Sequence, residues 1–580
     1  MIARAFLNIE HSLTGRRWIG PGADQQRLAQ AMAQATDLPA AVCQILAQRG
    51  VAPQDAKAYL APSLRDLMPD PMVLKDMGAA AARFLTAITN QQRIAIFGDY
   101  DVDGAASAAL LLTYLRAMGR EATLYIPDRI DEGYGPNEAA MAQLGAAHDL
   151  IICVDCGTLS HGPIAAANCD VLVLDHHLGA ETLPPAVAVV NPNRMDESGE
   201  LAHLCAAGVV FLLLVETNRH LRATGSNLPD LMGFLDLVAL ATVADVAPLI
   251  GLNRAFVRQG LKVMARRERV GLRALCDIGR LDSAPNAYAL GFVLGPRINA
   301  GGRIGQADLG ARLLATQSEA EAAALAERLD VLNTERREIE AAVRSEAMAQ
   351  AQARGLDAPL VWAAADGWHP GVVGIVAARL KEAARRPTVV IGFDGDIGKG
   401  SARSISGVDL GAAVQRLAGE GLLIKGGGHK MAAGLTVARD QLEAAMARLS
   451  ELLARQGAAA GEASDLHIDA LLATGGATPE LVAQIDAAGP FGASSPAPRF
   501  AFADMAVAAR PMGEGHLRLS FGDGMGQKLE AVLFGAFQTP MGDALLAGGA
   551  GRFHLAGRIE VNTWGGRTRV QLRLEDAARA

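Results

Sequence analysis

Short runs of apolar residues alternate with helix-type segments from about residue 93 to residue 260. The runs RIAIFGD, ATLYIP, LIICVD, VLVLDHH and AVAVVNP are continuously apolar, and the stretch from Gly104 to Met118 has helical character. Strands that are covered by helices on both faces show such unbroken apolar runs, whereas half-exposed strands alternate. The pattern therefore predicts a doubly wound α/β domain with a parallel sheet, which we place at residues 91–260.

A long stretch without glycine or proline follows at residues 317–354, with apolar residues mostly at spacings of three and four. Ser318 and Glu321 can form a capping box at its start, and Gly355 suits its end. A helix of this length would extend about 57 Å. We expect it to connect two domains as part of a helical region at 261–355, although a plain amphipathic packing helix explains the pattern nearly as well.

Two further domains are predicted after this helix. Apolar runs bounded by glycine, such as LVWAAA and TVVIGF, indicate a second α/β domain at 356–460. Short strand-type segments separated by turns then fill 461–580, and a five-stranded OB-fold barrel is our leading interpretation. Residues 1–90 form a helical, proline-punctuated segment to which we assign no chemistry.

Composition and charge narrow the classes of protein. Hydrophobic residues make up 50% of the chain and charged residues 20%, which is typical of an ordered globular protein. The longest apolar run, Leu204 to Val215, is shorter than the roughly 20 residues of a membrane-spanning helix, and the first residues do not resemble a secretory signal. The six scattered cysteines fit reduced core thiols better than a disulfide framework. We therefore expect a cytoplasmic protein without membrane contact.

The net charge of −8 argues against a dedicated nucleic-acid-binding module, because such modules usually carry a basic excess. The charge argues less against a nuclease. A carboxylate-rich metal site lowers the formal charge, whereas its bound cations restore positive potential where a phosphate would lie.

Carboxylates follow the first predicted strand in the motif GDYDVDG. Asp99, Asp101 and Asp103 stand where open α/β sheets bind their ligands. Alternate carboxylates in an extended stretch share one side and repel one another unless cations are present. This motif alone is explained equally well by a solvated acidic turn.

Two other predicted strands end in residues of the same kind. Asp155 ends one strand, and Asp175, His176 and His177 end the next. Neighbouring strands lie about 4.8 Å apart, so these groups can reach metal ions separated by roughly 3.5–4 Å. Asp245, in the apolar context LATVADVAPL, would gain a partner through metal ligation, although it could instead cap a helix.

Carboxylate and imidazole ligands suit Mn²⁺ or Mg²⁺ better than they suit metals that prefer thiolates. A pair of such ions activates water and stabilises a leaving oxygen, and phosphoester hydrolysis is the reaction class that most naturally needs both. The residues therefore predict a phosphoesterase that depends on two divalent metal ions.

The motifs also resemble a known family, the DHH phosphoesterases, and within them the RecJ single-strand-specific exonucleases. The strings GDYDVDGAAS, DRIDEGYGP, VDCGT, LDHH, NPN, ATVADV, GPRINAGGR, WHPGVVGIVAARL, GKGSARS and GGGHKMAAG occur in the order that the family shows. The resemblance spans about residues 60–575. It implies a DHH catalytic domain, a DHH-associated substrate domain and a C-terminal OB-like barrel.

The resemblance implies a role for each residue of the predicted metal site. Asp155 would bridge two ions, His177 would face the scissile phosphate, and Asp175 would orient a histidine. The remaining ligands would be Asp99 and Asp101 on one ion, and Asp103, His176 and Asp245 on the other. Related phosphoesterases have a histidine four positions before the second motif aspartate, and here that position is Phe97.

The resemblance also implies residues that bind substrate. Arg129, Ser401 and Arg403 would hold a terminal 5′-phosphate, and such a pocket favours a strand end over an interior phosphate. His429 would belong to a loop whose glycines let backbone N–H groups approach phosphate. Three more residues could line the nucleic-acid path, or could instead stabilise a loop through a salt bridge: Arg297, Asn299 and Arg303.

Together, residues and resemblance predict a 5′ to 3′ exonuclease that hydrolyses single-stranded DNA to mononucleotides in DNA repair and recombination. The resemblance implies a monomer that works with a RecQ-type helicase and a single-strand-binding protein. Two alternatives remain open. One is a DHH-family hydrolase of short oligoribonucleotides or cyclic dinucleotides, although those enzymes lack so large a C-terminal barrel. The other is a catalytically inactive single-strand-binding scaffold, which would require a broken metal set.

Overall fold

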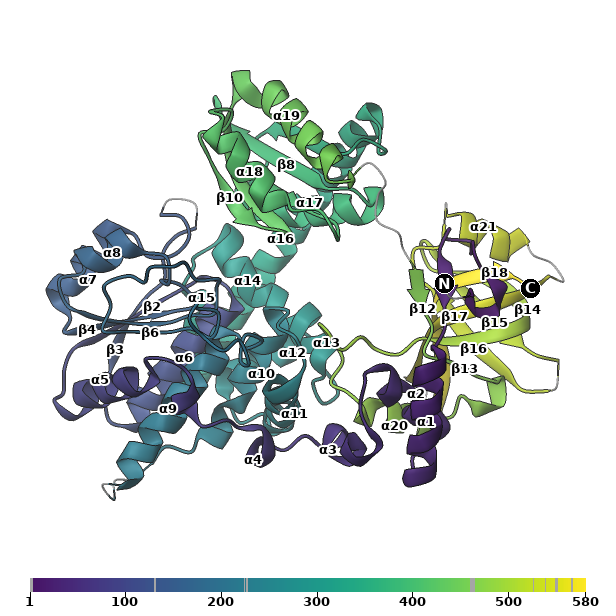
Figure 1. The fold of residues 1–580 in the computed structure, drawn as a ribbon, viewed down its shortest axis with the longest axis horizontal. Helices are drawn as coiled ribbons and strands as arrows, with labels where there is room; N and C mark the ends of the chain where they lie inside the picture. Colours follow the sequence, from purple (N-terminus) through teal and green to yellow (C-terminus); the bar gives the residue numbers. More distant parts are fainter. Residues whose placement is uncertain are drawn as a thin grey trace. The chain divides into compact units, whose positions relative to one another are not determined.

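The apolar runs near the start of the chain form a five-stranded parallel sheet in the computed structural model (Figure 1). The spatial order is β3-β2-β4-β5-β6. The strands are β2 (Ile94–Gly98), β3 (Ala122–Tyr125), β4 (Leu150–Val154), β5 (Asp170–Leu174) and β6 (Ala188–Val190). Every residue of β2 and β4 is buried, which explains their unbroken apolar character.

Helices cover both faces of this sheet. One face carries α5 (Met77–Thr89), α6 (Val102–Ala117) and α9 (Ala206–Ala223), and the other carries α7 (Glu138–Ala147) and α8 (His161–Ala166). The predicted doubly wound domain is therefore confirmed. The strand order reverses at β2, with β3 on one side and β4 on the other, and ligands bind such sheets at the carboxyl ends of the strands that flank the reversal.

The helical region that follows ends in the predicted long helix. Its helices are α10 (Leu235–Ala244), α11 (Gly251–Met264), α12 (Val270–Ile278), α13 (Ala287–Ala289), the π-helical turn η5 (Leu290–Leu294), α14 (Gly295–Ile304), α15 (Leu309–Ala315) and α16 (Glu319–Arg354). The Ser318 hydroxyl accepts a hydrogen bond from the Glu321 amide at 3.3 Å. The Glu321 carboxylate binds Thr316 instead of closing the box, so only half of the predicted capping box forms. Helix α16 packs against α14 of this helical region and against α17 of the next domain, so it connects the two.

The second α/β domain has a mixed five-stranded sheet in the order β10-β11-β9-β8-β7, in which only β7 and β8 run parallel. Its strands are β7 (Val361–Asp366), β8 (Thr388–Asp394), β9 (Ile397–Arg403), β10 (Lys425–His429) and β11 (Ala432–Ala438). Its helices are α17 (Pro370–Ala384), α18 (Leu410–Gly419) and α19 (Leu442–Arg455).

The C-terminal strands close into the predicted five-stranded barrel, because β14 pairs with both β15 and β17. Its strands are β14 (Phe500–Met512), β15 (His516–Gly522), β16 (Lys528–Leu533), β17 (Arg552–Trp564) and β18 (Arg567–Arg579), with β13 (Ala470–Leu471) added beside β14. Two helices accompany it, α20 (Pro479–Ala487) and α21 (Pro540–Ala547).

The N-terminal residues belong to the barrel. Strand β1 (Arg17–Ile19) pairs with β12 (Asp465–His467), and α1 (Ala23–Ala35) and α2 (Ala40–Gln48) share one hydrophobic core with β14. Trp18 is fully buried, and its indole N–H donates to Asp576 at 2.9 Å. The short helices α3 (Ala56–Leu60) and α4 (Leu64–Leu67) follow.

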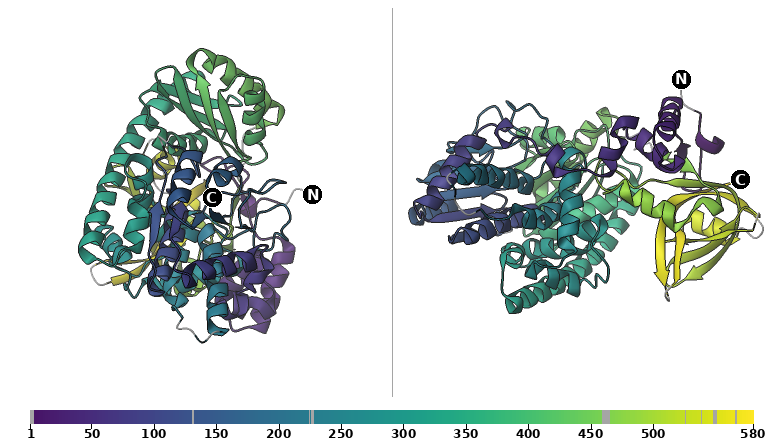
Figure 2. Two further views of the ribbon diagram at one scale, coloured as in Figure 1. Left: turned by 90° about the vertical axis from the view of Figure 1, so that its left-hand side faces the viewer. Right: turned by 90° about the horizontal axis from the view of Figure 1, so that it is seen from below.

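The structure describes residues 4–129, 132–223, 225, 228–458, 465–524, 526–537, 539–547, 551–564 and 567–580. The chain divides into two compact units (Figures 1 and 2). One comprises Pro69–Ala247 and Gln259–Ala463, and the other Met1–Met68, Pro248–Arg258 and Ser464–Ala580. Over the described ranges, no helix combines the length and apolar character needed to cross a membrane. All six cysteines are free, as expected of core thiols.

The buried Trp18 generates a stability prediction. We expect Trp18→Ala to destabilise the barrel unit by about 3–5 kcal/mol, because it removes a large buried ring. Trp18→Phe should cost about 1–3 kcal/mol, because it leaves the buried Asp576 without the indole donor. Calorimetry of the full chain should show the transition of this unit at a lower temperature in both variants. Arg27→Ala, on an exposed face of α1, is the control, and equal effects of all three changes would contradict the prediction.

Candidate metal centre

The first carboxylates of the site lie at the start of helix α6. Asp99 directly follows β2, and Asp101 is the N-cap of α6, where its side chain accepts hydrogen bonds from the amides of Asp103 at 2.8 Å and Gly104 at 3.2 Å. A Cβ atom at Gly104 would lie 2.3 Å from the Asp99 carbonyl oxygen. Only glycine therefore lets the helix begin so close to the strand end.

Asp103 is completely buried and is held by a second helix. Its two carboxylate oxygens accept hydrogen bonds from the amides of Ala206 at 2.7 Å and Ala207 at 2.8 Å, at the start of α9. Free N–H groups and the positive end of the helix dipole favour a negative charge at this place. This contact joins residues that are 103 and 104 positions apart in the sequence.

His176 lies at the centre of the cluster. Its Nε2 atom is 3.2 Å from Oδ1 of Asp155, 3.7 Å from Oδ2 of Asp103 and 3.8 Å from Oδ2 of Asp245. Asp155 follows β4 with a φ of 61°, a left-handed conformation that non-glycine residues seldom adopt. Asp245 is the C-cap residue of α10. Three elements thus bring carboxylates to one imidazole nitrogen.

Asp175 and His177 form a hydrogen-bonded pair beside this group. Asp175 Oδ1 is 2.8 Å from His177 Nδ1 and also accepts from the His176 and His177 amides, while Oδ2 accepts from the Thr158 amide at 3.1 Å. Burial alone would raise the pKa of Asp175, but the hydrogen bond and charge of His177 lower it far below its usual range. Burial alone would lower the pKa of His177, but Asp175 raises it to about 9. Asp175 therefore stays ionised and fixes the orientation of the His177 ring.

The donor set fits divalent cations. Among the described residues, three groups of side chains bring ligand atoms within 4.8 Å of one another: Asp99, Asp101 and Asp155; Asp103, His176 and Asp245; and Asp155, His176 and His177. The buried Oδ1 atoms of Asp99 and Asp155 accept no hydrogen bond there. Burial and neighbouring carboxylates raise the pKa of Asp99 and Asp155 well above its usual value, and that of Asp245 to about 8. Buried anions of this kind require cations, and oxygen and imidazole donors suit Mn²⁺ or Mg²⁺.

Several supporting residues had no role in our sequence interpretation. The Asn191 amide donates to the Thr158 hydroxyl and to the His177 carbonyl, both at 2.8 Å, and the Asn193 amide donates to the His176 carbonyl at 2.6 Å. The Tyr134 hydroxyl lies 3.2 Å from the Asp155 carbonyl and 3.1 Å from His177 Nε2. The motifs NPN and GYG contain these residues, so the signal was present, but neutral side chains do not indicate a ligand site by themselves.

Position 97 does not contribute to the cluster. Phe97 is fully buried and stacks on Tyr125 with ring centroids 5.3 Å apart, inside the core between β2 and the helices α7 and α8. Phe97 is therefore a core side chain and not part of the candidate ligand set.

Three of the predicted substrate residues line one pocket of about 380 Å³: Arg129, Ser401 and Arg403. Arg403 donates to the Ser401 hydroxyl at 3.0 Å. The Arg129 guanidinium lies 5.0 Å above the ring of Tyr100, the residue between Asp99 and Asp101. The pocket is therefore adjacent to the carboxylate cluster. His429 is exposed at the end of β10 and does not line the pocket.

The other three predicted substrate residues lie in different surroundings. Arg303 donates to the Gly371 carbonyl at 3.1 Å, directly behind the pocket, and burial together with the charge of Arg129 lowers its pKa to about 10. Asn299 accepts from the Val102 amide at 3.1 Å and so caps α6. Arg297 pairs with Asp330 at 2.8 Å, which is the salt-bridge alternative.

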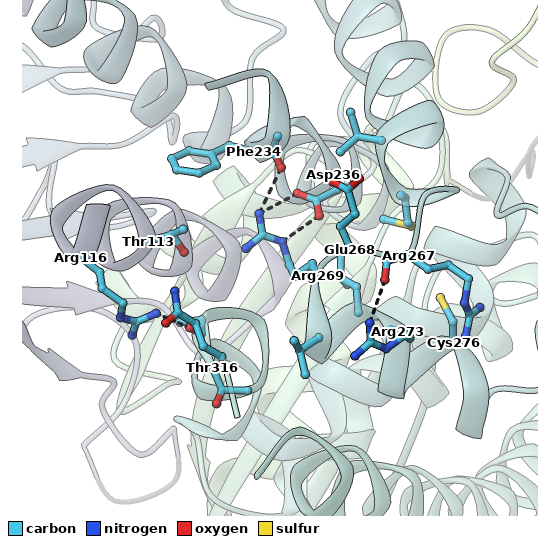
Figure 3. Close-up of a pocket in the computed structure, with 17 residues that line it drawn as sticks. Thr113, Arg116, Phe234, Asp236, Arg267, Glu268, Arg269, Arg273, Cys276 and Thr316 are labelled. Carbon is cyan, nitrogen blue, oxygen red and sulfur yellow. Dashed lines mark hydrogen bonds and ion pairs between the residues drawn. The ribbon is translucent and has the colours of Figure 1, made fainter. Parts of the chain in front are cut away.

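A second pocket, of about 250 Å³, lies between α6, α10 and α12 (Figure 3). Its charged groups are largely paired with one another or with neighbours. Arg269 forms two hydrogen bonds with Asp236, Arg273 pairs with Glu319, and Arg267 pairs with Asp277. The arginines here therefore tie helices together and leave little net charge for a ligand.

Comparisons with known proteins agree with this geometry. Family models match at residues 93–242 (DHH family, N-terminal domain), 357–455 (DHHA1 domain) and 468–576 (RecJ OB domain). The single-stranded-DNA-specific exonuclease RecJ of Dickeya dadantii is 38% identical over 559 residues, which cover 93% of this chain and 96% of the relative. RecJ of Escherichia coli is 33% identical with the same coverage.

A crystal structure of RecJ from Thermus thermophilus in complex with Mn²⁺ superposes with a TM-score of 0.81 and 31% identity, covering 97% of this chain and 79% of that one. The Mg²⁺ complex of the same protein gives a TM-score of 0.75 at 29% identity, with 97% and 78% covered. The identity, the coverage and the matches to three family models lead to one conclusion: this chain belongs to the RecJ family of single-stranded-DNA-specific exonucleases, within the DHH family.

Proposed function

We propose that this single-stranded-DNA-specific exonuclease begins at a 5′ end, releases mononucleotides and uses two divalent cations, Mn²⁺ or Mg²⁺. The observation that carries the proposal is the arginine pocket beside the carboxylate cluster. It places a site for an anion next to a site for cations, as the end of a nucleic-acid strand requires.

The chain's carboxylates and imidazoles would hold the two ions. Asp99 and Asp101 would take one, Asp103, His176 and Asp245 the other, and Asp155 would lie between them, as the ligand groups allow. Such ions supply Lewis acidity to a phosphodiester and lower the pKa of bound water. His177 does not need to be a ligand in this assignment. Its Nδ1 atom is hydrogen-bonded to Asp175, so the ring is held in one orientation beside Asp155, where it would face a bound phosphate.

The arginines favour a terminal phosphate. Arg303 and Arg403 are partly buried, and among the described residues neither has a carboxylate partner. Burial and the charge of Arg129 lower the pKa of both guanidinium groups, so a bound anion would stabilise them. A terminal phosphate carries nearly two negative charges, whereas a phosphodiester inside the strand carries one. The pocket should therefore prefer the strand end.

The chemistry renews the same end after each step. Water attacks the phosphorus between the first two nucleotides, and the bond to the 3′ oxygen of the first nucleotide breaks. The first nucleotide leaves with its 5′-phosphate, and the new phosphate stays on the remaining strand as its 5′ terminus. The product strand can thus enter the same arginine pocket.

The alternatives receive less support. A hydrolase of short oligoribonucleotides or cyclic dinucleotides does not need the RecJ OB domain that this chain carries. An inactive scaffold would have lost part of the metal set, whereas seven candidate ligand side chains converge here. We extend the proposal to a monomeric enzyme of the cytoplasm that acts in DNA repair and recombination with a RecQ-type helicase and a single-strand-binding protein, on the basis of the family resemblance.

The metal assignment predicts a linked effect on stability. Mn²⁺ at about 100 times its dissociation constant should stabilise the fold by about 2.7 kcal/mol. Asp155→Asn should abolish exonuclease activity and most of the stabilisation that Mn²⁺ provides. In chelator at neutral pH the variant should be at least as stable as the parent, because the raised pKa of Asp155 means that its charge destabilises the metal-free fold.

Thermal unfolding with Mn²⁺ or with chelator measures both effects. Asp282→Ala, an exposed carboxylate that is not part of the cluster, is the control and should behave as the parent does. If Mn²⁺ does not raise the unfolding temperature of the parent protein, the metal assignment is wrong.

The pocket assignment predicts a dependence on the strand terminus. Arg403→Ala should lower kcat/KM on 5′-phosphorylated single strands by about 10- to 100-fold, because a hydrogen bond between charged groups is worth about 1.5–3 kcal/mol. The loss on 5′-hydroxyl strands should be much smaller. Arg403→Lys should recover part of the activity, since it keeps the charge but not the planar fork.

The measurement compares end-labelled strands that differ only in the 5′ group, with Arg416→Ala on the exposed side of α18 as the control. Equal losses on both substrates would show that Arg403 does not recognise the terminal phosphate.

A further inference from the structure

Two aromatic rings stand in water close to the metal centre. Tyr288 is 58% exposed and Phe292 is 69% exposed, and they are the two most exposed tyrosine or phenylalanine side chains among the described residues. Their rings are stacked, with centroids 4.9 Å apart and planes at 28°. A fold that buries Phe84, Phe97 and Phe211 leaves this pair outside, although burial of one such ring is worth about 2 kcal/mol.

The local structure sets the direction in which the pair projects. Tyr288 lies in α13 and Phe292 in the π-helical turn η5, four residues later, so both project from one side of a continuous helical segment. The Asn286 side chain caps this segment by accepting from the Ala289 amide at 2.9 Å. Leu290 and Leu294 are fully buried on the other side. π-helical turns are rare and often mark functional sites.

The same helical segment packs against the backbone that carries the candidate metal ligands. A Cβ atom at Gly295 would lie 3.4 Å from Ala244 Cβ and 3.9 Å from Val102 Cγ2. Ala244 precedes Asp245, and Val102 stands between Asp101 and Asp103. Asn299 on α14 accepts from the Val102 amide. Phe292 precedes Asn299 by seven residues in the same uninterrupted helical run, η5 followed by α14.

We propose that Tyr288 and Phe292 form a base-stacking platform for the single strand, a few nucleotides from the scissile phosphate. The proposal rests on the proposed function and adds a substrate contact to it. Aromatic faces bind bases of any sequence. A base within a duplex already has both faces covered by its neighbours, so it cannot stack on the pair. The platform therefore contributes to the preference for single strands independently of the width of the active site.

A double-mutant cycle between the protein and the DNA tests the platform. The protein carries Tyr288→Ala and Phe292→Ala together, and the DNA is a 5′-phosphorylated oligothymidylate or the same strand with abasic nucleotides around the third position. Each change alone should raise KM in Mn²⁺ about 10- to 100-fold, from the usual contribution of one stacked base. The two changes together should raise KM little further, because both remove the same contact.

Conservative variants separate stacking from structure. Tyr288→Phe should retain the parental KM, whereas Phe292→Leu, which keeps an apolar side chain but loses the aromatic face, should follow the alanine variant. Val331→Ala, at an exposed apolar position of α16, is the matched control. If the alanine variant does not fold, Phe292→Leu completes the cycle.

The outcomes are distinct. If the effects of protein and DNA changes multiply fully, the rings do not contact bases and the platform is rejected; a contact with another protein surface would then be their use. If the parent degrades neither strand, the proposed function fails instead.

Discussion

The electrostatic repulsion among buried carboxylates at the carboxyl edge of the parallel sheet sets the conditions for the rest of the site. The strand order places β2 beside β4, so Asp99 and Asp155 meet at the point where the order reverses. Both have a carboxylate oxygen that accepts no hydrogen bond from the described residues. The fold therefore brings together negative charges that the described residues do not fully neutralise, and this uncompensated charge would favour the binding of cations.

Helix ends stabilise some of these negative charges and destabilise another. The N-termini of α6 and α9 direct amides at Asp101 and Asp103, which stabilises these two carboxylates. Helix α10 has the opposite polarity, because its C-terminus ends at Asp245, where the dipole disfavours a negative charge. The pKa of Asp245 is correspondingly high, about 8, with burial as its main cause. The candidate ligands thus differ in how strongly they depend on a cation, and Asp99 and Asp155, which combine strongly raised pKa values with an oxygen that accepts no hydrogen bond from the described residues, depend on it most.

Local patterns predicted much of the fold and the acidic part of the site, because buried strands produce unbroken apolar runs and their ends produce polar motifs. Contacts between distant residues could not be predicted in this way. The cap that Asn299 provides for α6 spans 197 residues, and the packing of α1 and α2 onto the barrel joins the two ends of the chain. Arg297 is another example of a contact that the local sequence does not predict. It forms a salt bridge with Asp330, which lies 33 residues away. The charge of an arginine is visible in the sequence, whereas its partner is not.

The site also keeps the positive charge of an arginine, Arg129, apart from the negative charges of the carboxylate cluster. Arg129 lies near the carboxylate cluster, and its charge is felt by Asp99, yet no ion pair joins it to any of the cluster's carboxylates, all of which the structure describes. Its guanidinium lies over the Tyr100 ring instead, a position that a cation–π interaction stabilises. Direct pairing would leave neither a cation site nor an anion site. Tyr100, placed between Asp99 and Asp101 in the sequence, therefore allows both to exist side by side.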